Sequence, residues 1–178
     1  DDAECVDEVP LRRATTHLLE AGVHGIFAMG STGEAVALPE REWRRCIEII
    51  LDEVRGRVPV LAGVSMPSTS LAIERLRAAQ SLGVAAAVAT LPYFFRLNRA
   101  EIISHYNELA ASAAIPIYAY DSPLTKMSFD EGIVAELFAM NPIVGLKDSS
   151  NNFTQFQKLV ARFGHQGYFF FQGNETML

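Results

Sequence analysis

Short apolar runs alternate along the chain with longer segments in which apolar residues recur every three or four positions. The runs are continuous, which is typical of strands that are buried on both faces of a parallel sheet. The longer segments have the periodicity of amphipathic helices, which can cover such a sheet. The six predicted strands occupy residues 26–29, 58–64, 85–91, 116–120, 143–147 and 168–171.

Helices are predicted before and between these strands, in the segments 9–21, 39–54, 68–82, 102–113, 128–138 and 152–163. Two of them begin with recognisable capping signals. Ser128 and Glu131 have the spacing of a capping box, and Asn152 with Gln155 resembles a cap as well. Strands that alternate with helices of this length predict β-α units and a parallel sheet.

Two α/β architectures fit this alternation, an open doubly wound sheet and a closed barrel. The glycine-rich fingerprints for dinucleotides and for phosphates are missing from the sequence. Polar residues instead follow several different strands, which is where a (β/α)8 TIM barrel gathers its active site. Such a barrel needs eight strands and typically about 250 residues. We therefore predict an incomplete TIM barrel without its first and last strands, forming a single domain over residues 1–178.

Composition narrows the function classes. Of the 178 residues, 49% are hydrophobic and 20% charged, with a net charge of −6, which argues against nucleic acid or an anionic membrane as the main partner. No apolar run approaches the roughly 20 residues of a membrane span, and the acidic start lacks the features of a signal peptide. With only two cysteines, Cys5 and Cys46, the sequence predicts a cytoplasmic protein without a disulfide framework.

The apolar stretch 143–150 delivers a lysine, Lys147, just before a polar turn. Burial disfavours the charged form of an amine and pushes its pKa down, which makes a lysine suited to forming a Schiff base with a ketone. Two alternatives remain open from this stretch alone. Lys147 could pair with a carboxylate such as Asp148, or its ammonium could extend to the end of the strand.

Two other strand ends carry candidate residues. Gly30 and Gly33 flank Ser31 and Thr32 in a turn that can present backbone N–H groups and hydroxyls to a carboxylate, although an ordinary tight turn has the same composition. Tyr120 ends the strand that precedes the lysine strand, so its phenol could relay protons, or it could serve core packing alone. Together with a buried lysine, these parts indicate a class I aldolase that acts on a 2-oxo acid.

Three segments make a family resemblance specific: residues 25–34 (GIFAMGSTGE), 120–123 (YDSP) and 145–149 (GLKDS). From end to end the chain resembles the dihydrodipicolinate synthase / N-acetylneuraminate lyase family of pyruvate-dependent aldolases. The resemblance implies that Lys147 forms the imine with pyruvate and that Tyr120 shuttles protons, with Ser31 as its relay. It also implies that Thr32 and the amides of the turn 30–33 hold the pyruvate carboxylate, and that Gly173 borders the pocket.

The sequence departs from this family pattern in three places. The synthases carry an arginine shortly after the tyrosine-proline segment, whereas Leu124, Thr125 and Lys126 follow Pro123 here, which is closer to the sialic acid lyases. Lys126 could replace the arginine only as a point charge. Phe94 stands where the synthases donate a phenol across a subunit interface. Residues 174–175 (NE) could contact the hydroxyls of a sugar acid.

We therefore expect a lyase that makes or breaks a carbon–carbon bond of a 2-oxo sugar acid through an imine on Lys147. The alternatives are dihydrodipicolinate synthase itself, a dehydratase of keto-deoxy sugar acids, and a barrel that binds a 2-oxo acid without turnover. No cofactor is expected, and the resemblance implies a homotetramer. No metal is expected either, because the histidines are scattered without the spacing of ligands: His17, His24, His105 and His165.

Overall fold

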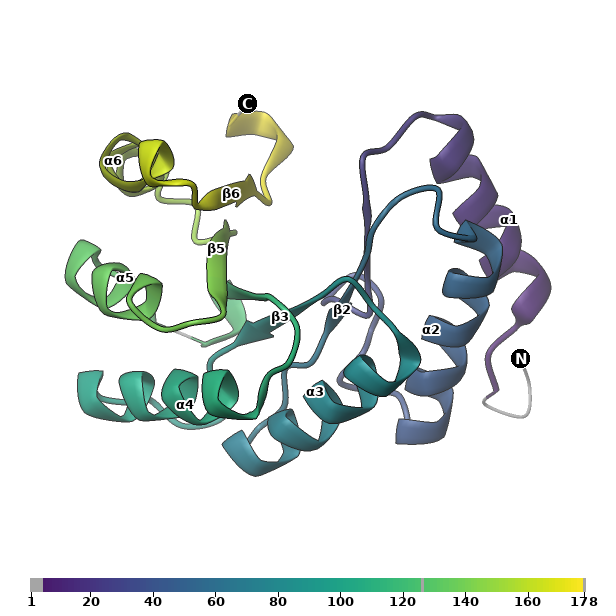
Figure 1. The fold of residues 1–178 in the computed structure, drawn as a ribbon, viewed down its shortest axis with the longest axis horizontal. Helices are drawn as coiled ribbons and strands as arrows, with labels where there is room; N and C mark the ends of the chain where they lie inside the picture. Colours follow the sequence, from purple (N-terminus) through teal and green to yellow (C-terminus); the bar gives the residue numbers. More distant parts are fainter. Residues whose placement is uncertain (1–4, 126, 178) are drawn as a thin grey trace.

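The computed structural model describes residues 5–125 and 127–177, which form one six-stranded sheet with helices along its outer side (Figure 1). All neighbouring strands are parallel, and their order in the sheet is their order in the sequence. The strands are β1 Ile26–Ala28, β2 Val60–Gly63, β3 Ala86–Thr90, β4 Ile117–Asp121, β5 Ile143–Asp148 and β6 Phe169–Gln172. The α-helices are α1 Glu8–Glu20, α2 Glu40–Val54, α3 Thr69–Leu82, α4 Arg99–Ser112, α5 Glu131–Phe138 and α6 Phe153–Phe163.

The core lies between the sheet and the arc of helices. Helix α2 illustrates how it forms, because its apolar residues recur on one face and reach the sheet while its charged residues, except the buried Glu42, lie toward solvent. Trp43 on this helix is fully buried, and its Nε1–H donates to the Gly63 carbonyl at 3.1 Å. Every residue of β3 is buried, as expected for a strand covered on both faces.

The predicted fold class is confirmed. All six strands exist within three residues of their predicted ends, they form parallel β-α units, and the sheet curls as part of a barrel (Figure 1). In the described part of the chain, the outer strands β1 and β6 pair with one neighbour each, so the barrel is incomplete. No helix in the described ranges has the length and apolar character that a membrane span requires.

One predicted helix start is wrong. The N-cap of α5 is Asp130, whose Oδ1 accepts from the Ile133 N–H at 2.7 Å, whereas Ser128 lies outside the helix. The chain before the helix is held elsewhere, because the Phe129 N–H donates to Asp121 on β4 at 2.9 Å. The other predicted cap is confirmed, since Asn152 Oδ1 accepts from the Gln155 N–H at 3.1 Å.

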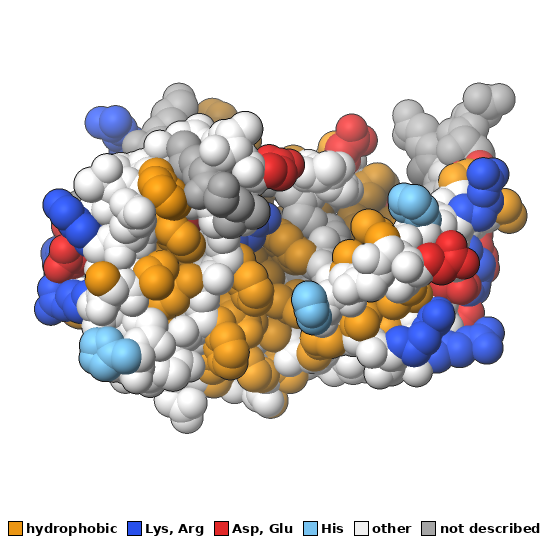
Figure 2. Space-filling view, turned by 90° about the horizontal axis from the view of Figure 1, so that it is seen from above, with side chains coloured by type: hydrophobic (Ala, Val, Ile, Leu, Met, Phe, Trp, Pro, Cys, Tyr) orange, Lys and Arg blue, Asp and Glu red, His pale blue; other side chains and the backbone are white. Residues whose placement is uncertain are grey.

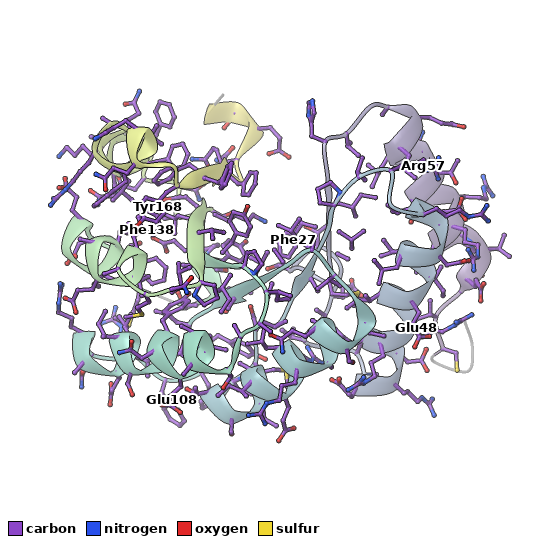
Figure 3. All side chains as sticks on the ribbon, in the orientation of Figure 1. Phe27, Glu48, Arg57, Glu108, Phe138 and Tyr168 are labelled. Atoms are coloured by element: carbon purple, nitrogen blue, oxygen red, sulfur yellow. The ribbon has the colours of Figure 1, made fainter. Side chains whose placement is uncertain are left out.

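The curl of the sheet leaves an apolar inner surface, which we call the concave face. Figure 2 shows apolar side chains gathered in a hollow of the molecule, and Figure 3 shows Phe27 inside the arc of helices. A cavity of about 670 Å³ lies along this face, and Phe169 and Phe171 at its edge are 57% and 45% exposed. The concave face is formed by Phe27, Leu61, Val88, Tyr118, Phe169 and Phe171.

Candidate active site

The candidate site lies at the carboxyl ends of the strands, where β4 and β5 present Tyr120 and Lys147 side by side. These two residues are register partners across the parallel pair, so their side chains emerge on the same face of the sheet. The next register pair, Asp121 and Asp148, therefore faces the opposite way, toward the helices. Backbone pairing alone thus brings the lysine and the phenol together.

The amine of Lys147 lies between two aromatic rings. Its Nζ is 4.5 Å from the ring centroid of Phe27 and 4.5 Å from that of Tyr120. Both distances are those of cation–π contacts, which stabilise an ammonium without a carboxylate partner. The alternative of an ion pair with Asp148 is not supported, because Asp148 Oδ1 accepts hydrogen bonds from the Ser150 N–H and Oγ–H on the other side of the strand. Lys147 also lines the cavity of the concave face, so a small molecule can approach its amine.

The phenol of Tyr120 is surrounded by hydroxyl groups. Its O–H donates to Ser149 Oγ at 3.3 Å. Burial by itself would raise the pKa of Tyr120, but the Ser149 hydroxyl, the charge of Lys147, and the hydroxyls of Ser31 and Ser122 outweigh it and lower this pKa below its usual value of 10. A phenol whose anion is stabilised in this way is suited to passing protons in either direction.

The turn after β1 borders the phenol. Gly30 and Ser31 line a small pocket of about 20 Å³ together with Tyr120 and Leu124. The left-handed backbone positions of this turn are Met29 and Glu34, with φ of 58° and 51°, rather than its glycines. Gly30 is required for space instead, since a Cβ there would lie 2.9 Å from the Phe27 ring.

The predicted site residues divide into two groups. Lys147, Tyr120, Ser31 and Gly30 converge, whereas Thr32 and Gly33 lie on the exposed side of the same turn and do not line the pocket. Gly173, which follows β6, joins the first group because it lies against Ser149, the hydrogen-bond partner of Tyr120. Its N–H donates to the Asp148 carbonyl at 2.7 Å, and a Cβ on Gly173 would overlap the Ser149 hydroxyl.

Two residues of the site were missed in the sequence. The hydroxyl oxygen of Ser149 accepts the hydrogen bond of the Tyr120 phenol, and Phe27 forms one wall of the lysine site. Ser149 lies inside the segment 145–149 that carries the family resemblance, so a signal for it existed. Phe27 likewise lies inside the segment 25–34, but its contact with Lys147 could not be predicted, because only the curl of the sheet brings β1 opposite β5.

The departures from the family pattern can be located in part. Leu124 lines the small pocket and is 49% exposed, so an apolar side chain stands close to where an arginine was sought. Phe94 is 78% exposed in the segment after β3 and stacks edge-on against Phe95. Lys126, the other candidate cation, lies outside the described residues. Among the residues that are described, no three His, Cys, Asp or Glu side chains come together as a metal site.

Comparison with known proteins finds similar sequences and similar structures. A 4-hydroxy-tetrahydrodipicolinate synthase of Methanospirillum hungatei is 34% identical over 168 residues, which are 94% of this chain and 57% of that protein. The crystal structure of a dihydrodipicolinate synthase from Acinetobacter baumannii complexed with pyruvate matches with a TM-score of 0.90 at 28% identity, covering 94% of this chain and 58% of that one. The structure of CdNal from Clostridium difficile in complex with mannosamine matches with a TM-score of 0.91 at 28% identity, covering 97% and 59%.

The chain thus spans less than two thirds of the length of these relatives. The match to the family nevertheless extends over every residue of this chain. The model of the dihydrodipicolinate synthetase family covers residues 1–178, and the chain belongs to that family.

Proposed function

We propose that this chain carries the imine-forming centre of a pyruvate-dependent lyase, with Lys147 as the nucleophile. The observation that carries the proposal is the position of the Lys147 amine, 4.5 Å from the rings of Phe27 and Tyr120 and open to a cavity. A lysine that has no carboxylate ion-pair partner among the described residues and lies next to a proton-carrying phenol is the arrangement that Schiff-base chemistry needs.

In the proposed reaction the uncharged amine of Lys147 attacks the keto carbon of pyruvate and gives a carbinolamine. Tyr120 delivers the proton with which the carbinolamine hydroxyl leaves as water, and an imine remains. Transfer of a methyl proton to the phenolate that Tyr120 has become then gives an enamine, whose carbon can attack an aldehyde. Ser31 and Ser149 hold the phenol and exchange protons with it.

The turn 30–33 is the proposed site for the pyruvate carboxylate. Gly30 and Ser31 contribute to the pocket beside the phenol, and Thr32 follows them on the same turn. Gly173 is proposed to border the bound substrate, because its missing side chain leaves room for the Ser149 hydroxyl. Removing the hydroxyl of Ser31 should weaken both pyruvate binding and proton transfer.

The names of the relatives favour 4-hydroxy-tetrahydrodipicolinate synthase as the full reaction. One observation favours the second candidate, an aldolase of sugar acids: Leu124 offers no charge to the carboxylate of a second substrate. Turnover of the substrates of the synthase, compared with cleavage of N-acetylneuraminate, distinguishes the two candidates. We propose a homotetramer on the family resemblance alone, and sedimentation tests that proposal.

The imine is tested by treating the folded chain with pyruvate and borohydride, followed by peptide mass spectrometry. We expect a reduced pyruvyl adduct on Lys147, absent from Lys147→Arg and retained in Lys158→Arg, which changes an exposed lysine on α6. Circular dichroism first establishes that each protein is folded. A folded chain that binds pyruvate without forming an adduct would instead be a 2-oxo acid binder without turnover.

A further inference from the structure

Three buried polar atoms without a hydrogen-bond partner form one row across the sheet. Among the described residues these atoms are Asp121 Oδ1, Asp148 Oδ2 and Gln172 Nε2. Asp121 is the register partner of Asp148, and Asp148 is the register partner of Gln172, so the row crosses β4, β5 and β6. The row lies directly behind Tyr120 and Lys147, on the helix side of the same strand ends.

The other polar atoms of the row have partners. Asp121 Oδ2 accepts from the Phe129 N–H at 2.9 Å, and Asp148 Oδ1 accepts from both the N–H and the Oγ–H of Ser150 at 2.9 Å. Gln172 Oε1 accepts from the Asn174 N–H at 3.0 Å, which identifies its free end as the amide nitrogen. The free carboxylate oxygens are thus held by anchored side chains, not by mobile ones.

Two ionised carboxylates cannot both remain in such a place at low cost. Asp121 is 3% exposed and Asp148 is 1% exposed, so solvent does not screen their repulsion. Burial and the neighbouring charge of Asp148 raise the pKa of Asp121 to about 6, and the hydrogen bond from Phe129 offsets only part of this. A single proton between the two groups removes the repulsion and supplies a donor to an unpaired oxygen.

We propose that Asp121 and Asp148 share one proton, carried by Asp121, and that this pair positions Tyr120 and Lys147 by joining the ends of β4 and β5. The hydrogen bonds decide which residue is charged. Asp148 Oδ1 accepts two hydrogen bonds, whereas Asp121 accepts one through Oδ2. Hydrogen bonds to a carboxylate favour its charged form, so Asp148 holds the charge.

The pair continues the backbone ladder at the point where it ends. The Ser149 N–H donates to the Asp121 carbonyl at 2.9 Å, and the Gly173 N–H donates to the Asp148 carbonyl at 2.7 Å. Loss of the shared proton places two negative charges between strands that carry Tyr120 and Lys147 one residue earlier. The strand ends are then pushed apart, and the phenol and the amine lose their register.

Other titratable groups surround the pair. From α4 the phenol of Tyr106 is close enough for the charge of Asp121 to raise its pKa, but its O–H donates to the Ala89 carbonyl at 2.7 Å. Lys147 and Tyr120 lie on the opposite face of the sheet. His105, also on α4, titrates at lower pH, so stability must be compared between variants and not followed in one protein alone.

The first test compares thermal unfolding of the native chain with Asp121→Asn and Asp148→Asn. An asparagine keeps the acceptor for the Phe129 or Ser150 N–H and offers an N–H to the remaining carboxylate without a proton from solvent. We expect the Tm advantage of Asp121→Asn over the native chain to be small near about pH 5 and to grow toward about pH 7. Asp52→Asn, a change at an exposed ion pair, is the matched control and should show no such growth.

The second test follows the carboxyl carbons of aspartate-labelled native chain and of Asp148→Asn by NMR. If the proton is shared, the titration of Asp121 moves to lower pH when the charge of Asp148 is removed. An unchanged Asp121 titration in Asp148→Asn would overturn the proposal, since burial alone would then hold the proton. If Asp121→Asn does not fold, the NMR titration of the native chain alone still tests the proposal. Titration of both Asp121 and Asp148 near about pH 4 in the native chain would overturn it.

The positioning role, which rests on the proposed function, is tested by trapping the pyruvate imine across the same pH range. We expect the ratio of trapping rates, Asp121→Asn over native, to rise from about one near pH 5 as pH increases, while the Asp52→Asn ratio stays at about one. A ratio that does not change with pH would overturn the positioning role. If the native chain forms no imine, the proposed function is wrong. The shared proton would still be tested by the unfolding and NMR experiments, because they do not depend on imine formation.

Discussion

At the scale of single residues, Tyr120 is the group on which most of the site converges. Removing its hydroxyl in Tyr120→Phe keeps the ring beside Lys147 but takes away the proton carrier. We expect imine formation with pyruvate to slow by about 10²- to 10⁴-fold, the range for loss of a general acid–base group. Tyr168→Phe is the control, because Tyr168 lies before the start of β6, at the opposite end of that strand from the site, and its phenol donates to the Phe138 carbonyl at the end of α5. Equal rates in Tyr120→Phe and the native chain would remove the phenol from the mechanism.

Ser149 should tune the phenol without taking part in bond formation. Its hydroxyl is the largest of the contributions that lower the pKa of Tyr120, so Ser149→Ala should raise that pKa. The measurement is the ultraviolet absorbance of tyrosinate as a function of pH, with the curve of Ser149→Ala compared with that of the native chain. Tyr120→Phe identifies which part of the absorbance belongs to this phenol. An unchanged titration in Ser149→Ala would mean that Lys147 and the other hydroxyls suffice.

His105 is a buried histidine with a structural role. It is 2% exposed, Thr69 Oγ1 lies 2.9 Å from its Nδ1, and its Nε2–H donates to the Thr90 carbonyl at 3.2 Å. Burial lowers its pKa from 6.5 to about 4, so the unfolded chain binds a proton more readily than the folded one between these values. The contribution of uncharged His105 to the free energy of unfolding is therefore fully present above about pH 6.5, and it is lost as pH falls through about 4.

The expected loss attributable to His105 is about 3 kcal/mol on going from neutral pH to below pH 4. Asp121 acts in the opposite direction, because its raised pKa makes the folded chain more stable as pH falls through about 6. Urea unfolding of His105→Gln against the native chain isolates the histidine. The stability difference between them should change with pH, whereas His165→Gln, at an exposed position, should track the native chain.

At the scale of elements, the start of α5 gives a direct test. Asp130→Ala should lower the free energy of unfolding by about 1 kcal/mol, the usual cost of losing an N-cap. Ser128→Ala should change it by less than about 0.5 kcal/mol, because that side chain is exposed and caps nothing in the described structure. Chemical denaturation of both variants provides the comparison. A larger effect at Ser128 would restore the capping box that the sequence suggested.

The elements could be predicted because each strand is short, apolar and flanked by helical periodicity. Their ends were less predictable, as the α5 cap illustrates. Ser128 and Glu131 have capping-box spacing, yet the helix begins at Glu131 with Asp130 as its N-cap, and the Phe129 N–H donates to Asp121 on β4, which holds the preceding chain against the sheet. A local sequence pattern does not contain this contact, because it joins residues that come together only when β4 and the loop after it are in place.

The same distinction applies to the site. Lys147 and Tyr120 could be predicted as neighbours, because each ends a strand and the strands adjoin. Phe27 and Ser149 lie in the segments 25–34 and 145–149 that carry the family resemblance, but their contacts with Lys147 and Tyr120 depend on the curl of the sheet and on the position of one hydroxyl. The pairing of Asp121 with Asp148 was hidden for a related reason, since register decides which residues of two strands meet.

At the scale of the whole molecule, the curled sheet separates two kinds of surface. The helices cover its outer side with charged residues, and ion pairs join neighbouring helices, as between Arg12 on α1 and Asp52 on α2 at 2.6 Å. The concave face stays apolar and borders a cavity of about 670 Å³. Figure 2 shows this contrast, with apolar side chains in the hollow and charged ones toward the periphery.

Because an apolar surface of this kind binds hydrophobic probes, the 178-residue chain should increase the fluorescence of a naphthalene sulfonate dye while remaining folded. Phe171→Ser removes an aromatic ring that is 45% exposed on the concave face, and it should weaken dye binding several-fold. Phe153→Ser makes the same chemical change at a 37% exposed position on α6, outside the concave face, and should leave dye binding nearly unchanged. Equal losses in the two variants would mean that the dye reports general surface hydrophobicity and not the concave face. A loss confined to Phe171→Ser would locate the binding surface on the inner side of the curled sheet, next to the Lys147 amine.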